Sequence, residues 1–119
     1  MSLLYRGNCH CGTVKFSFKL SALLEELEVV SCNCSICTKN GYLMVYPKAS
    51  DTKRDHEEDA VKEYRFASKQ FPHYFCVTCG TSVYAKGPEG SDIMAVNART
   101  LEGIDVEKLK LKKVDGRSA

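Results

Sequence analysis

Seven cysteines gathered in three short clusters constrain this chain more than any other feature of its sequence. The clusters read Cys9-His10-Cys11-Gly12, Cys32-Asn33-Cys34-Ser35-Ile36-Cys37 and Cys76-Val77-Thr78-Cys79-Gly80. Thiolates two or three residues apart can chelate one ion, and a structural zinc closes its tetrahedron with four ligands. Seven thiols therefore divide naturally into one closed site of four and one open site of three.

The rest of the sequence indicates a protein whose thiols stay reduced. The first residues, Met1 to Arg6, lack the apolar core of a secretory signal, and no apolar run approaches the ~20 residues of a membrane-spanning helix. We therefore expect a cytoplasmic protein, with the nucleus as the alternative compartment. There, an odd number of cysteines favours metal binding over disulfide bonds.

Chain length and net charge limit the number of domains and the kinds of binding partner that we expect. The 119 residues are expected to form one domain, residues 1–119, with a modest core. A net charge of +2 gives no electrostatic reason to expect nucleic acid or an anionic membrane as a partner.

Alternation of apolar and polar residues predicts a mainly β protein of about six to eight short strands. The clearest strand covers residues 13–20, in which Val14, Phe16 and Phe18 alternate with polar residues. The other predicted strands cover residues 28–31, 42–46, 63–67, 73–76, 82–85 and 93–97. A helical turn is expected from Ser35. Residues 48–62 are expected to be a solvated loop, and residues 106–113 fit a helix and a strand equally well.

Spacing alone allows two partitions of the thiols. The first is a zinc ribbon made from two Cys-x-x-Cys pairs: Cys34, Cys37, Cys76 and Cys79. The second joins the two outer clusters in one four-thiol site: Cys9, Cys11, Cys76 and Cys79. It leaves the central cluster as a compact trio: Cys32, Cys34 and Cys37. Both outer clusters end in Cys-Gly, and glycine lets the backbone turn tightly and bring N–H groups close to a thiolate, which favours the second partition.

A trio of thiols around zinc would keep a fourth position for water, a substrate thiol or an oxygen, as catalytic zinc sites do. Two alternatives remain at this point. An aspartate or one of the imidazoles, which are His10, His56 and His73, could complete the site and make it structural. The trio could also hold no metal and act as a reactive dithiol.

These motifs together resemble the glutathione-dependent formaldehyde-activating enzyme family, which also includes the centromere protein V-like domains. The resemblance rests on the three cysteine clusters in this order, followed by Val96-Asn97-Ala98-Arg99-Thr100-Leu101-Glu102-Gly103-Ile104-Asp105. It extends over nearly the whole chain, from about Gly7 to Gly116.

The resemblance implies a β-tent fold, in which zinc joins twisted antiparallel sheets, as in type B methionine sulfoxide reductases. It implies two zinc ions per chain. A structural ion would be held by Cys9, Cys11, Cys76 and Cys79, and a second ion, near a thiol-substrate site, by Cys32, Cys34 and Cys37. The activity best known for the family is the condensation of glutathione with formaldehyde to S-hydroxymethylglutathione, which is carbon–sulfur lyase chemistry.

We therefore expect a zinc-dependent carbon–sulfur lyase acting on a small thiol, such as glutathione, and a small aldehyde. The trio would favour the thiolate form of a substrate thiol, whose ordinary pKa is about 8.5. His73 is the candidate general acid or base, and Arg99 is the candidate contact for a substrate carboxylate. The alternative is a non-catalytic zinc module that binds a protein or nucleic acid through the basic residues 108–113.

Overall fold

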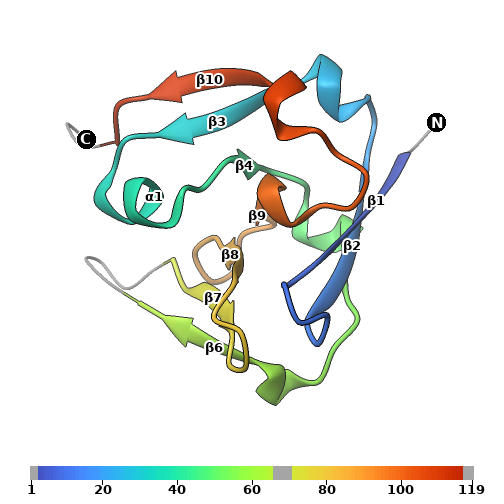
Figure 1. The fold of residues 1–119 in the computed structure, drawn as a ribbon, viewed down its shortest axis with the longest axis vertical. Helices are drawn as coiled ribbons and strands as arrows, with labels where there is room; N and C mark the ends of the chain where they lie inside the picture. Colours follow the sequence, from blue (N-terminus) through green and yellow to red (C-terminus); the bar gives the residue numbers. More distant parts are fainter. Residues whose placement is uncertain (1–2, 66–70, 117–119) are drawn as a thin grey trace.

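The computed structural model describes residues 3–65 and 71–116, and their fold is mainly β, as predicted (Figure 1). The strands in chain order are β1 (Leu3–Asn8), β2 (Lys15–Leu20), β3 (Glu28–Cys32), β4 (Met44–Val45), β5 (Thr52–Arg54), β6 (Val61–Tyr64), β7 (His73–Cys76), β8 (Ser82–Lys86), β9 (Met94–Asn97) and β10 (Lys110–Val114). The helical elements are α1 (Ser35–Asn40) and five 3₁₀ turns: η1 (Leu24–Glu26), η2 (Ala49–Asp51), η3 (Glu58–Ala60), η4 (Ala98–Thr100) and η5 (Val106–Lys108). Among the described residues, no helix is long and apolar enough to span a bilayer.

The strands form two sheets. The smaller sheet has the order β1-β2-β5, and the larger has the order β10-β3-β4-β9-β8-β7-β6. In the part of the chain that the structure describes, neighbouring strands pair antiparallel except β10, which runs parallel to β3 at the edge of the larger sheet. Figure 1 shows β1 and β2 lying beside the larger sheet, and α1 lying below the ends of β3 and β10.

The core lies between the two sheets. Alternation along β2 turns Phe16 and Phe18 inward, and both are almost fully buried. The Phe16 ring meets the Tyr84 ring of β8 edge-on, with centroids 5.7 Å apart, and Tyr84 is fully buried. In the register of the larger sheet, Tyr84 lies opposite Val96, which lies opposite Val45. These side chains therefore share the face that packs on the smaller sheet.

Several sequence predictions need correction at particular strands. The expected strand 42–46 is reduced to β4, because within residues 42–46 only Met44 and Val45 pair with the neighbouring strands β3 and β9. The expected loop 48–62 contains β5, which pairs with β2 and whose charged residues still reach solvent. The strand expected at 63–67 begins earlier, as β6, and residues 66 and 67 lie outside the described residues. The strand β1 was not predicted, and the described residues hold more strands than expected.

Residues 106–113, whose period was ambiguous, divide between a 3₁₀ turn and a strand. Asp105 caps η5 by accepting a hydrogen bond from the Glu107 N–H at 3.1 Å, and β10 follows directly. The helical turn expected from Ser35 is α1, which ends at Gly41 in the left-handed conformation, with φ 63°.

Candidate functional site

The two outer cysteine clusters meet at the junction of the two sheets. Cys9 and Cys11 lie in the turn between β1 and β2, whereas Cys76 ends β7 and Cys79 lies in the turn before β8. Their four sulfur atoms all lie within 4.8 Å of one another. The Cys9–Cys11 and Cys11–Cys76 sulfur distances are 3.6 and 3.7 Å. Tetrahedral zinc with bonds of about 2.3 Å requires sulfur–sulfur edges of about 3.8 Å, so this group fits the ion.

The two turns that carry these thiols are near copies of each other. Each reads Cys-Gly-Thr, and Gly12 and Gly80 both have positive φ, at 82° and 77°. The hydroxyls of Thr13 and Thr81 lie 3.2 Å from the sulfur of the preceding cysteine. The threonines are site residues that the sequence analysis missed, and the repeated Cys-Gly-Thr triplet was the signal that could have revealed them.

The surroundings of the four thiols favour a bound cation. Cys9 and Cys76 are 0% and 1% exposed, and the backbone N–H of Val14 donates to the Cys9 sulfur at 3.2 Å. Burial, with a further contribution from the neighbouring thiols, raises the pKa of Cys9 to about 11. The Thr81 hydroxyl lowers the pKa of Cys79 to about 5. A cation would be needed for the buried thiol to ionise beside its neighbours.

The central cluster forms a second, separate group. Cys32 ends β3, Cys34 precedes α1 and Cys37 lies within it. Their sulfur atoms also lie within 4.8 Å of one another, and all three residues are partly exposed. Burial and the adjacent thiols raise the pKa of Cys37 to about 12. The chain after β10 passes closely over this group, because a Cβ atom added to Gly116 would overlap the Cys32 sulfur.

The structure therefore groups the thiols by the second partition and not as a zinc ribbon. Within residues 3–65 and 71–116, no histidine, aspartate or glutamate joins either group. All seven cysteines are free thiols. The trio thus offers three protein ligands at a partly exposed position, which is the donor set of an open zinc site.

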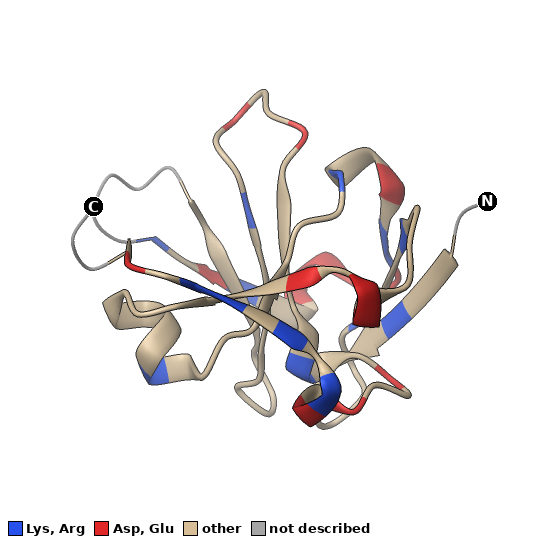
Figure 2. Ribbon diagram, turned by 90° about the horizontal axis from the view of Figure 1, so that it is seen from above, with Lys and Arg blue, Asp and Glu red and all other residues tan. Residues whose placement is uncertain are grey.

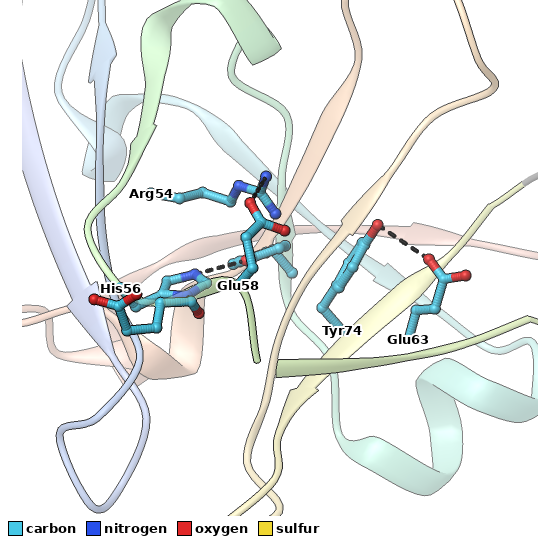
Figure 3. A network of polar contacts seen from close by, with 7 residues as sticks. Arg54, His56, Glu58, Glu63 and Tyr74 are labelled. Atoms are coloured by element: carbon cyan, nitrogen blue, oxygen red, sulfur yellow. Dashed lines mark hydrogen bonds and ion pairs between the residues drawn. The ribbon is translucent and has the colours of Figure 1, made fainter. Parts of the chain in front are cut away.

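Two of the three histidines that were candidates to complete the trio lie elsewhere in the structure. Both ring nitrogens of His56 are engaged elsewhere: Nε2 lies 2.8 Å from the Tyr84 hydroxyl and Nδ1 lies 2.8 Å from the Glu57 carbonyl oxygen. Figure 3 shows His56 near the Arg54–Glu58 ion pair, with Tyr74 and Glu63 in the same polar network. His10 is exposed on the first cysteine turn. Neither histidine completes the trio.

Two hollows open beside the trio. A hollow of about 500 Å³, which we call the polar hollow for the charged, amide and hydroxyl side chains at its border, is walled in part by Cys32 and Cys37, with Asn33, Thr38, Tyr42, Arg99, Lys113 and Asp115. A mainly apolar hollow of about 300 Å³ is walled by all three thiols and, among others, by Val30, Ile36, Met44, Ile93 and Ala95. Arg99 borders the first hollow and His73 borders the second.

Arg99 is held at its hollow by the end of α1. Its Nε donates to the Gly41 carbonyl oxygen at 2.7 Å, while the residue as a whole remains exposed. The neighbouring Asn97 has a structural role, because its amide donates to the Ser82 carbonyl at 3.0 Å and accepts from the Arg99 N–H at 3.2 Å. The segment after β9 is therefore fixed relative to β8 and presents Arg99 beside the trio.

His73 is half-buried and lies next to a buried tyrosine. Its Nδ1 lies 3.4 Å from the Tyr42 hydroxyl, and the two rings are 5.7 Å apart. Burial lowers the pKa of His73, which favours the neutral imidazole near neutral pH. Tyr42 borders the polar hollow and His73 the apolar one, so this pair connects the two sides of the trio.

The basic segment on which the binding-module alternative depended is an exposed sheet edge. All of β10 is exposed, and Lys110 lies opposite Glu28 of β3 in the register. Figure 2 shows acidic and basic positions interspersed along this edge and the neighbouring turns. This mixture of charge is typical of a solvated edge.

Comparisons with known proteins agree with this architecture. The family model described as glutathione-dependent formaldehyde-activating enzyme matches residues 4–113. A protein of Schizosaccharomyces pombe, named an uncharacterized lyase, is 28% identical over 102 residues, which cover 85% of this chain and 71% of that protein. The crystal structure of a Rhodobacter sphaeroides protein matches with a TM-score of 0.78 at 24% identity, over 90% of this chain and 99% of that one. This last likeness supports the fold alone.

Proposed function

The chain belongs to the glutathione-dependent formaldehyde-activating enzyme family, and on that premise we propose that it is a zinc-dependent carbon–sulfur lyase. Its substrate would be the adduct of a small thiol, such as glutathione, and a small aldehyde. The observation that carries the proposal is the contrast between the two thiol groups. The four-thiol group includes two buried sulfurs and joins two sheets, whereas the partly exposed trio borders two hollows.

Each thiol group would hold one zinc ion. Cys9, Cys11, Cys76 and Cys79 would hold a structural ion, since four thiolates leave no position for a substrate. Cys32, Cys34 and Cys37 would hold the second. Zinc bound there would supply a positive charge that favours the thiolate form of a substrate at neutral pH.

The polar hollow is the proposed place of the thiol substrate. Arg99 and Lys113 border it and Asp115 lies on the same wall, so the hollow combines two cations with one carboxylate. The Arg99 guanidinium, fixed through Nε to Gly41, can still offer its terminal N–H groups to a carboxylate such as those of glutathione. This contact would orient the thiol toward the trio.

The reaction requires one proton transfer and no redox change. The thiol sulfur forms a bond to the aldehyde carbon, the carbonyl π bond breaks, and the thiol proton ends on the former carbonyl oxygen. We assign this transfer to His73, because it borders the hollow that is walled by all three cysteines of the trio. The adjacent Tyr42 hydroxyl would hold the ring in position. The reverse steps release the aldehyde from the adduct.

The experiment that tests this function is an exchange measurement. The interconversion of glutathione, ¹³C-formaldehyde and S-hydroxymethylglutathione is followed by NMR with zinc-loaded protein, with the Cys34→Ser variant and without protein. The wild-type chain should accelerate exchange well above the uncatalysed rate, and Cys34→Ser should not. Equal rates in all three samples, for formaldehyde and also for a larger aldehyde such as hexanal, would refute the proposed lyase function.

A further inference from the structure

A formaldehyde adduct has no substituent on its carbonyl carbon, yet the trio borders a hollow that could hold one. The apolar hollow of about 300 Å³ is walled by Cys32, Cys34 and Cys37, so whatever occupies it lies next to the trio. This volume is at the lower end of the range for small-molecule sites.

The hollow arises from small side chains on the outer face of the larger sheet. His73, Ala85 and Ala95 are successive partners in the register of β7, β8 and β9, so their side chains share one face. It is the face opposite to that of Tyr84 and Val96, because side chains alternate along a strand. Two alanines at the centre leave a depression where larger residues would fill the space.

Exposed apolar side chains gather at the same place. Within the described residues, nine large apolar side chains are exposed, and four of them border this hollow: Tyr46, Phe71, Ile93 and Val114. A concentration of exposed apolar side chains around a concave site is typical of a ligand-binding position.

The polar groups of the hollow are few. Apart from the thiols, the titratable side chains on its wall are His73, Tyr46 and Lys86. The Lys86 ammonium lies over the Tyr74 ring, 5.3 Å from its centroid, and Tyr74 lies opposite Tyr84 on the other face of the sheet. The lysine charge is therefore directed away, and the interior of the hollow favours an apolar group.

We propose that the aldehyde acted on by this chain carries an aliphatic or aromatic substituent, which occupies the apolar hollow while the thiol partner occupies the polar one. This proposal rests on the proposed lyase function. The two hollows share Cys32, Cys37 and Val114, so one adduct can extend into both. The step is the one given above: sulfur bonds to the aldehyde carbon, and the carbonyl oxygen takes the thiol proton.

Binding of unreactive S-alkylglutathiones tests this proposal without catalysis. Each buried methylene group strengthens binding by about three- to fourfold, and S-hexylglutathione has five more methylene groups than S-methylglutathione. Since the hollow is open on one side, we expect the wild-type chain to bind the hexyl analogue at least about tenfold more tightly in isothermal titration. Equal affinity for the two analogues, or no binding of either, would overturn the proposal.

Two matched variants test whether the preference for the hexyl analogue arises from contacts in the apolar hollow. Ile93 borders the hollow and is 48% exposed, whereas Leu111 of β10 is 45% exposed and does not border it. Ile93→Asp should reduce the hexyl preference to less than about threefold with little effect on the methyl analogue, and Leu111→Asp should keep the wild-type preference. If Ile93→Asp fails to fold, Ala95→Leu, which fills the hollow, should have the same effect. A hexyl preference that survives filling would contradict the assignment.

The two proposals fail in different ways. Accelerated exchange with formaldehyde, together with equal binding of the two analogues, would leave the lyase function standing and reject the apolar substituent. Tighter binding of the hexyl analogue without any acceleration of adduct exchange, for formaldehyde or for hexanal, would reject the lyase function itself.

Discussion

Replacing one cysteine in each thiol group should separate the structural role from the catalytic one. Cys76 is buried and its sulfur lies 3.7 Å from that of Cys11, which is 65 residues away in the chain. An ion held there links distant parts of the sequence. The ends of the trio, Cys32 and Cys37, are only five residues apart, so an ion held there constrains the unfolded chain much less.

The size of the difference follows from loop entropy. A metal ion that joins residues 65 positions apart removes more conformational entropy from the unfolded chain than an ion that joins residues five positions apart. Because this entropy grows with the logarithm of loop length, the longer link stabilises the folded state by about 2 kcal/mol more. For a domain of this size, that difference corresponds to a melting temperature about 8 °C lower for Cys76→Ser than for Cys34→Ser. Full loss of the structural ion could add to the effect, since such sites supply on the order of 10 kcal/mol in small zinc modules.

The assay combines thermal unfolding, followed by circular dichroism, with native mass spectrometry of the same samples. Cys34→Ser should lose one zinc ion, keep its strand signal and melt near the wild-type temperature. Cys76→Ser should lose the other ion and melt much earlier. Equal melting temperatures for the two variants, or a Cys76→Ser protein that keeps both ions and its stability, would refute the division of roles.

Three further predictions follow from the geometry. His73→Gln should lower kcat at least about tenfold. In the wild type, kcat/KM should fall as the pH drops below the lowered pKa of His73, where the imidazole gains a proton and can no longer accept one, and this limb should be missing in the variant. Arg99→Ala should raise KM for glutathione about tenfold with kcat nearly unchanged, and should not affect cysteamine, a thiol without a carboxylate; an equal effect on both thiols would contradict the contact. Gly80→Ala should cost about 1–2 kcal/mol by chemical denaturation, because φ is 77° and a Cβ strains that conformation, whereas unchanged stability would show that the turn can relax.

The sequence was most informative where chemistry depends on local spacing. The thiols of Cys34 and Cys37 come together because one helical turn separates them, and the strand predicted at residues 73–76 is β7. The meeting of Cys11 with Cys76 was favoured by the shared Cys-Gly ending and implied by the family resemblance, since no local pattern encodes contact between two turns 65 residues apart.

Other features depend on tertiary structure and could not be read from periodicity. β5 has three residues, two of them charged, and is a strand only because β2 offers its edge. The apolar hollow depends on Ala85 and Ala95 facing the same side of a sheet, whereas the sequence shows only two small residues ten positions apart. His56 resembled a ligand in sequence, and only the buried Tyr84 hydroxyl beside it explains its position.

The central claim is that four thiols hold one ion and three thiols hold another that keeps a position open. Zinc K-edge X-ray absorption of the purified chain, together with its zinc content, tests this claim most directly. The account predicts two zinc ions per chain and, as the mean of four and three, 3.5 sulfur neighbours per ion, with a nitrogen or oxygen atom completing the second site. One zinc ion per chain surrounded by four sulfur atoms would contradict it.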